Sequence, residues 1–147
     1  MTNEKLVMHM YNVILGAQIV AVLVCLLSIV LLLYQRNTQQ SKMMLLTIVC
    51  AFIQNFGYLL ELTSTDLGEV MIAIQVEYVG TAYIAYFLTV FMLRYSNIRV
   101  SEKLSWVWFS FSTIVLCCVL TYKVNTIYYS SVDFVHTGFF SHVVLGK

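Results

Sequence analysis

Four long apolar stretches, separated by short polar segments, are the feature that most limits how this chain can fold. They cover residues 13–34, 43–61, 70–94 and 104–122. A helix needs about 20 mainly apolar residues to cross the hydrocarbon core of a bilayer. The chain is 61% hydrophobic and 10% charged, whereas soluble domains are about 45–50% apolar and about 25% charged. These features predict one membrane domain with four spanning helices.

The expected fold is an all-α membrane protein whose four transmembrane helices form an antiparallel bundle, because the connections between the stretches are short. The chain contains no proline, so no helix is expected to carry a proline kink. Residues 127–145 differ from the rest. They are rich in β-branched and aromatic residues on both sides of a break at Thr137 and Gly138, which predicts a β-hairpin outside the membrane.

The distribution of lysine and arginine predicts the orientation of the bundle. Five of the eight basic residues flank one set of helix ends, namely Arg36, Lys42, Arg94, Arg99 and Lys103. The other side has Lys5, Lys123 and Lys147. Positively charged residues are enriched on the cytoplasmic side, so both termini are expected outside the cell. Aromatic residues suited to a cytoplasmic interface belt occur at the side with five basic residues, namely Tyr34, Tyr95, Trp106 and Trp108.

Several classes of function find no support in the residues. The four cysteines lie inside apolar runs without a CxxC pair, which favours packing over a redox or metal role. His136 and His142 flank the predicted hairpin without partner thiols or carboxylates, so the case for a metal site is weak. There is no nucleophile–base pair or phosphate loop, and no basic patch for nucleic acid. No catalytic residue, metal site or cofactor is therefore predicted.

The segment between the second and third helices is acidic. Asp66 and Glu69 fall in the expected outer turn, where Thr65 or Asp66 can cap the 70–94 helix and Glu69 lies near its first turn. Glu61 and Glu77 fall inside the helices instead. An ionisable group within a membrane segment is costly and suggests a functional site. A carboxyl of Glu77 hydrogen-bonded to Tyr58, Gln54 or the backbone of the 43–61 helix is the structural alternative.

Two polar faces are expected to meet between these helices. Steps of four from Glu77 give one stripe of small and polar residues, Ala73, Glu77, Thr81, Ala85 and Thr89. The 43–61 helix has its own polar face, formed by Cys50, Gln54, Tyr58 and Glu61. Small residues let membrane helices approach closely, so the two faces are predicted to pack together.

The stretch FGYLLELTSTDLGEVMIAIQVEYVGTAYIAYFLTVFMLRYS resembles the N-terminal seven-helix sensor region of bacterial histidine kinases and diguanylate cyclases. The matching residues are Tyr58, Glu61, Glu77, Tyr78 and Gly80, followed by Phe87, Phe91 and Tyr95. The resemblance implies that the first five form a ligand-binding site. The sequence departs from the family pattern at Ala85, where many relatives have a proline, and at Val76 before the glutamate.

Seven helices are typical of that family, so a chain with four is expected to be an N-terminal fragment. The resemblance implies the sensory input region of a bacterial signalling protein in the inner membrane, controlling a cytoplasmic kinase or cyclase module in cis. The signal would be an extracytoplasmic small molecule or a state of the lipid bilayer. A homodimer is an open option. The alternatives are a small four-helix transporter and a structural membrane subunit.

Overall fold

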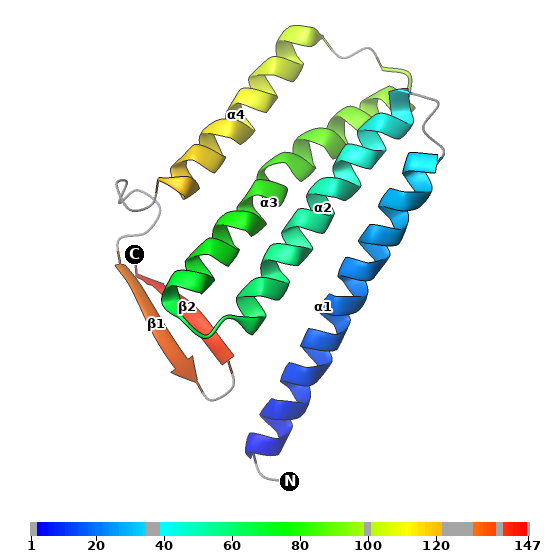
Figure 1. The fold of residues 1–147 in the computed structure, drawn as a ribbon. Coiled ribbons are helices and arrows are strands. Elements are labelled where there is room, and N and C mark those ends of the chain that lie inside the picture. The colour runs from blue at the N-terminus through cyan, green and yellow to red at the C-terminus, as the bar shows by residue number, and fades with distance from the viewer. Residues whose placement is uncertain (1–2, 35–38, 99–100, 122–130, 138–139, 147) are drawn as a thin grey trace.

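The computed structural model describes residues 3–34, 39–98, 101–121, 131–137 and 140–146 (Figure 1). Four helices make up most of it: α1 (Asn3–Tyr34), α2 (Gln39–Thr63), α3 (Leu67–Tyr95) and α4 (Glu102–Leu120). All four are long and apolar enough to cross a membrane, as the sequence predicts. Consecutive helices run in opposite directions, and the main contacts between helices join consecutive ones (Figure 1).

The first helix is longer than its apolar run. It begins at Asn3, whereas the hydropathy pattern predicted a start near residue 13. The additional residues include Glu, Lys, Leu and Met, which have high helix propensity. Hydropathy marks only the part of a helix that can lie in the bilayer and does not locate the helix end. In the structure, α1 extends well beyond the end of α2 (Figure 1).

Local side-chain and backbone bonds define both ends of α3. Asp66 is the N-cap, and its Oδ2 accepts a hydrogen bond from the Gly68 backbone N–H at 3.0 Å, which confirms one of the two predicted caps. At the other end Asn97 has φ 57°, a left-handed conformation that asparagine tolerates. The N–H groups of Asn97 and Ile98 then bond to the carbonyls of Arg94 and Leu93, respectively, which forms a Schellman motif.

The N-cap supports a first prediction. Replacing Asp66 with alanine removes the acceptor for a helix N-terminal N–H, and we expect the free energy of unfolding to fall by about 1 kcal/mol. Thr65→Ala is the matched control, because the hydrogen bond of Thr65 to Glu69 uses its backbone N–H. Unfolding in mixed detergent micelles measures both variants. An equal loss in the two variants would show that the Asp66 side chain is not the cap.

Only a small core is shielded from the surroundings. Among the described residues, the buried apolar side chains are Val22, Cys50, Val70, Met71, Ala73, Val90 and Val119. Many large apolar side chains are exposed instead, above all along α1, where Leu27 is 61% exposed and Val30 is 62% exposed. In water this surface would be unfavourable, whereas lipid tails solvate it as well as a protein interior does. The packing therefore fits a multi-pass membrane protein.

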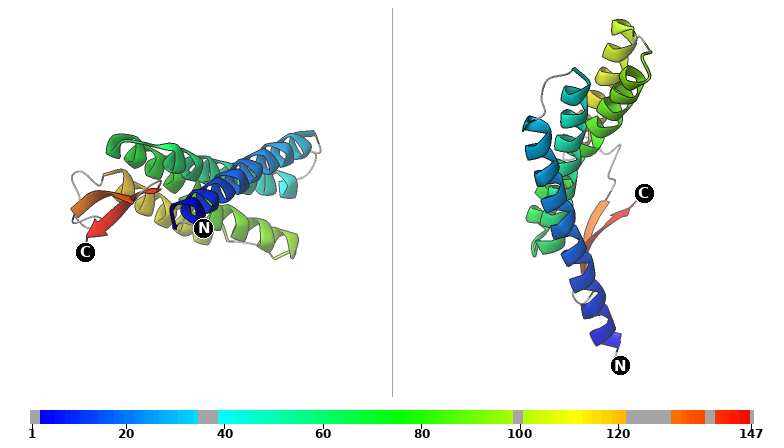
Figure 2. Two further views of the ribbon diagram at one scale, coloured as in Figure 1. Left: turned by 90° about the horizontal axis from the view of Figure 1, so that it is seen from below. Right: turned by 90° about the vertical axis from the view of Figure 1, so that its right-hand side faces the viewer.

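A two-stranded antiparallel sheet follows the helices in the chain. Strand β1 (Ser131–Thr137) pairs with β2 (Phe140–Gly146), and Thr137 lies opposite Phe140. The connection at residues 138–139 and the start of the predicted hairpin, residues 127–130, are outside the described part. Figure 2 shows the helices and the sheet from two further directions. His136 and His142 lie on the two strands, but the structure does not describe their side chains.

Candidate functional site

The closest helix contact in the described part is the crossing of α2 and α3, and two glycines make it possible. A Cβ atom added to Gly57 would lie 2.5 Å from the backbone nitrogen of Glu77 and 2.7 Å from its Cα. A Cβ on Gly80 would meet the Cys50 carbonyl oxygen and lie 2.5 Å from the Gln54 backbone nitrogen. No side chain fits in either place, so the two backbones touch directly. We call the contact between Cys50, Gln54, Gly57, Glu77 and Gly80 the glycine crossing.

Glu77 belongs to this crossing, and Glu61 follows Gly57 by about one helical turn on α2. Both lie toward the end of the bundle that carries the α2–α3 turn, here called the turn end. Both side chains are partly buried, and they come from adjacent helices whose backbones touch at Gly57. Neither carboxyl accepts a hydrogen bond from any residue that the structure describes. The predicted bond from Tyr58, Gln54 or the α2 backbone to Glu77 is therefore wrong. Within the part of the chain that the structure describes, no basic side chain forms an ion pair with either of them.

The predicted stripe on α3 is only partly correct. Ala73 is buried and Glu77 lies at the crossing, but Thr81 and Ala85 are exposed. The Thr81 hydroxyl donates to its own helix, at the Glu77 carbonyl. A helix has 3.6 residues per turn, so steps of four rotate steadily away from a fixed direction. The face of α3 that contacts α2 instead follows steps of four and then three residues, through Ala73, Glu77 and Gly80.

The same correction applies to α2. Cys50 and Gln54 contact Gly80 as predicted, but the next member of the contacting face is Gly57, and Tyr58 is 38% exposed. Of the five predicted ligand-binding residues, the structure thus brings Glu61, Glu77 and Gly80 together at or beside the crossing. Tyr58 lies beside it on α2, and Tyr78 is partly buried on α3. Each helix has one glycine in this region, Gly57 on α2 and Gly80 on α3. Because small residues let membrane helices approach closely, these two glycines could have identified the contacting faces from the sequence.

Polar side chains attach α1 to α2. The Tyr11 hydroxyl donates to the Leu62 carbonyl at 2.9 Å, near the turn end. Gln18 Nε2 donates to the Asn55 carbonyl at 2.7 Å and to its Oδ1 at 3.1 Å. Hydrogen bonds between membrane helices contribute about 0.6 kcal/mol each on average. These bonds hold α1 against the helix that contacts α3 at the glycine crossing.

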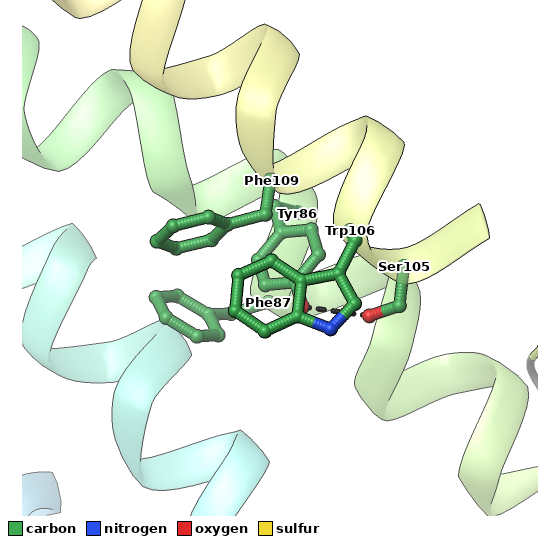
Figure 3. Close-up of a pocket in the computed structure, with 5 residues that line it drawn as sticks. All are labelled: Tyr86, Phe87, Ser105, Trp106 and Phe109. Carbon is green, nitrogen blue, oxygen red and sulfur yellow. Dashed lines mark hydrogen bonds between the residues drawn. The ribbon is translucent and has the colours of Figure 1, made fainter. Parts of the chain in front are cut away.

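The contact between α3 and α4 is aromatic, which the sequence analysis did not predict. Tyr83 and Tyr86 hydrogen-bond to Thr113 and Ser105 of α4, at 3.1 and 2.8 Å. Both tyrosine rings also pack against Phe109, with centroids 5.3 and 5.5 Å away. A cavity of about 290 Å³ lies beside this cluster, with walls formed by Tyr86, Phe87, Ser105, Trp106 and Phe109 (Figure 3). A ring-lined space of this kind suits an apolar occupant, such as a lipid chain.

A second cavity, of about 340 Å³, lies at the turn end. Its walls are Leu60, Thr63, Ser64, Glu69, Ile72 and Ala73. Neither Glu61 nor Glu77 lines it, so the predicted site and this cavity are separate features. Within the described residues, no group of three or more histidine, cysteine or acidic side chains could hold a metal ion. The four cysteines form no disulfide.

Four candidate spans, an exposed apolar surface and polar contacts between helices define a multi-pass membrane protein. The comparison with protein families then identifies which class of membrane protein it is. Residues 17–147 match the family model described as the N-terminal 7TM region of histidine kinase, and the chain belongs to this family. It is thus a membrane sensor region of the histidine kinase family, which confirms the predicted resemblance. No curated protein and no solved structure matches the sequence.

Proposed function

We propose that the chain receives an extracytoplasmic or membrane signal at the turn end of α2 and α3 and passes it to a cytoplasmic kinase module in cis. Family membership supports the sensory role over the transporter and structural-subunit alternatives. The observation that carries the location is the pair Glu61 and Glu77. The two acidic side chains are partly buried, come from adjacent helices that touch at Gly57, and form no hydrogen bond with any described residue.

Such a pair gives the site two states. Bringing like charges together is unfavourable, so a proton, a cation or an amine bound between the carboxyls stabilises the arrangement in which they are close. A signal shifts the balance between two conformations only by its difference in affinity for them. The glycine crossing is the pivot in this proposal, because the backbones of α2 and α3 touch one turn away from Glu61. A change in the distance between the carboxyls then tilts one helix against the other.

The proposal places the chain in the inner membrane of a bacterium, with the turn end outside. Tyr58, Tyr78 and Gly80 complete the proposed ligand site. The positive-inside distribution supports this orientation, because the opposite end carries five of the eight basic residues. The hairpin after α4 is assigned to the outer side on the same basis.

Accessibility of introduced cysteines tests the orientation. We expect a cysteine at Thr65, in the α2–α3 turn, to react with an impermeant maleimide in intact cells. A cysteine at Ser101, the N-cap of α4, should react only after the cells are opened. Both positions are exposed, so they form a matched pair. The four native cysteines are first replaced by alanine. The reverse labelling pattern would place the carboxyl pair on the cytoplasmic side and would contradict the proposal.

The signalling role is tested in the full-length protein with a transcriptional reporter of kinase output. We expect Glu61→Gln and Glu77→Gln to change the basal output and to weaken its response to a step in external pH. Asp66→Asn is the control, because Asp66 is an exposed acidic residue at the same end of the bundle. Output is normalised to protein abundance in the membrane. If both glutamine variants respond like the parent, the carboxyl pair is not the site that receives the signal.

A further inference from the structure

The cavity at the turn end has an apolar side and a polar side. Its walls come from two helices, with Leu60, Thr63 and Ser64 at the end of α2 and Glu69, Ile72 and Ala73 in the first two turns of α3. The volume is about 340 Å³, and cavities of about 300 Å³ and larger hold small molecules. Leu60, Ile72 and Ala73 offer apolar side chains, so an occupant must place an apolar group against them.

The two hydroxyl groups on the polar side can only accept hydrogen bonds from an occupant. A hydroxyl has one proton to donate. The Thr63 hydroxyl donates its proton to the carbonyls of Leu59 and Leu60, at 3.0 and 3.1 Å. The Ser64 hydroxyl donates to the Leu60 carbonyl at 2.7 Å. Because a carbonyl oxygen cannot donate, the direction of these bonds is fixed, and only lone pairs remain on the two hydroxyl oxygens.

Glu69 adds a carboxylate to the same side of the cavity. Its Oε2 accepts the Thr65 backbone N–H at 3.2 Å, which holds the side chain against the turn. Its Oε1 accepts no hydrogen bond from any residue that the structure describes. An acidic residue in the first turn also interacts favourably with the helix dipole, but that role leaves Oε1 open. The three polar side chains of the walls therefore present acceptors, and one of them is negatively charged.

The charge of the surrounding segment also favours a cation. Residues 57–80 contain four acidic residues and neither lysine nor arginine. Lys5 is a described basic residue toward this end of the bundle, but it precedes Tyr11 by six residues on α1. Tyr11 already reaches the Leu62 carbonyl at the end of α2. Lys5 is therefore beyond the cavity, and no described basic side chain lines the walls.

We propose that this cavity binds a small primary amine with a short alkyl chain. An ammonium group has three N–H donors, which equal in number the acceptors offered by Glu69 Oε1 and the two hydroxyl oxygens. The alkyl chain lies against the apolar side. Neither Glu61 nor Glu77 lines the cavity, so the site does not depend on the proposed role of that pair.

The amine comes from the water at this end of the bundle. Residues 63–66 are all polar, so the turn lies outside the hydrocarbon core. The headgroup of an aminophospholipid is the other source of a primary ammonium. In that headgroup a phosphate follows the ammonium after two carbons, and this anion would lie near Glu69 or against the apolar side. A free amine is therefore the favoured occupant.

Ligand-observed NMR tests the site with butylammonium as the probe. The full-length protein is purified into phosphatidylcholine nanodiscs, and empty nanodiscs correct for partitioning of the probe into lipid. Butyltrimethylammonium has the same charge but no N–H group, and butanol has no charge. We expect butylammonium to bind about tenfold more tightly than either. Equal affinity for the two cations, or no binding of butylammonium to the parent protein, would refute the site.

Three variants identify the residues that carry the binding. Glu69→Gln removes the charge but keeps an oxygen for the Thr65 N–H, and we expect the affinity for butylammonium to fall about tenfold. Thr63→Val removes one acceptor at nearly constant shape and should lower the affinity about threefold. Asp66→Asn is the matched control, because Asp66 is an exposed acidic residue of the same turn that does not line the cavity, and asparagine still caps α3. If Asp66→Asn weakens binding as much as Glu69→Gln does, the amine responds to diffuse charge and the site is refuted.

Nanodiscs that contain phosphatidylethanolamine separate a free amine from a lipid headgroup. We expect the affinity for butylammonium to be the same in these nanodiscs. Loss of binding would show that the headgroup occupies the cavity and would contradict a site for a free amine. Circular dichroism checks that the variants are folded. The comparison of the two cations uses the parent protein, so it tests the site independently of any variant.

Discussion

Gly80→Leu is expected to separate α2 from α3 and to lower the free energy of unfolding by about 3 kcal/mol. Even a single Cβ atom at Gly80 would meet the Cys50 carbonyl oxygen and lie 2.9 Å from the Gln54 Cβ. Overpacking a close contact costs about 1–3 kcal/mol. A leucine here would meet backbone atoms, which cannot move away by rotation as a flexible side chain could. Gly80→Ala should lose about 1–2 kcal/mol for the same reason. Unfolding in mixed detergent micelles measures both.

The chain contains its own control for this experiment. A Cβ on Gly16, in α1, would meet no atom within 4 Å. Gly16→Ala should therefore be neutral or raise stability by up to about 1 kcal/mol, because alanine favours the helix. If Gly80→Ala and Gly16→Ala have the same effect, the two backbones do not touch at Gly80, and the crossing is looser than described.

Glu77→Leu is expected to abolish the response to an external pH step while leaving the bundle at least as stable as the parent. Removing a buried polar group usually strands its partner and destabilises a protein. The Glu77 carboxyl has no hydrogen-bond partner among the described residues, and Glu61 is a second acidic side chain near the same crossing. Replacing it with an apolar side chain should raise the free energy of unfolding by about 1 kcal/mol.

Two measurements on the same variant check this expectation, namely unfolding of the purified chain and kinase output of the full-length protein. A gain of stability with a loss of response is typical of residues kept for function rather than for folding. A loss of more than about 1 kcal/mol would instead show that Glu77 has a structural partner. In that case the changed output of the variant would reflect damage to the fold.

Hydropathy and turn chemistry were sufficient to predict the helices. Their number, their order and the cap at Asp66 depend on local properties of the chain, which a single sequence displays. The start of α1 at Asn3 was missed because the residues before the apolar run are helical without being hydrophobic. A search for apolar residues cannot detect such an extension.

The details of the site depend on which atoms meet across two helices, and the sequence predicts this less well. Glu61, Glu77 and Gly80 were identified, and they lie at or beside the glycine crossing. Gly57 was missed because its role is to have no side chain where the backbone of Glu77 passes. The aromatic contact around Phe109 was also missed, because aromatic side chains of an apolar helix can face either the lipid or a neighbouring helix.

A double-mutant cycle on kinase output tests most directly whether Glu61 and Glu77 form one signal-receiving site. The parent, Glu61→Gln, Glu77→Gln and the double variant are compared in the full-length protein, with output measured across the same external pH steps and normalised to abundance. Residues that act together show non-additive effects. The account predicts that the double variant responds no more weakly than the more affected single variant. Effects that simply add would show that the two carboxyls act separately, and would contradict a shared site.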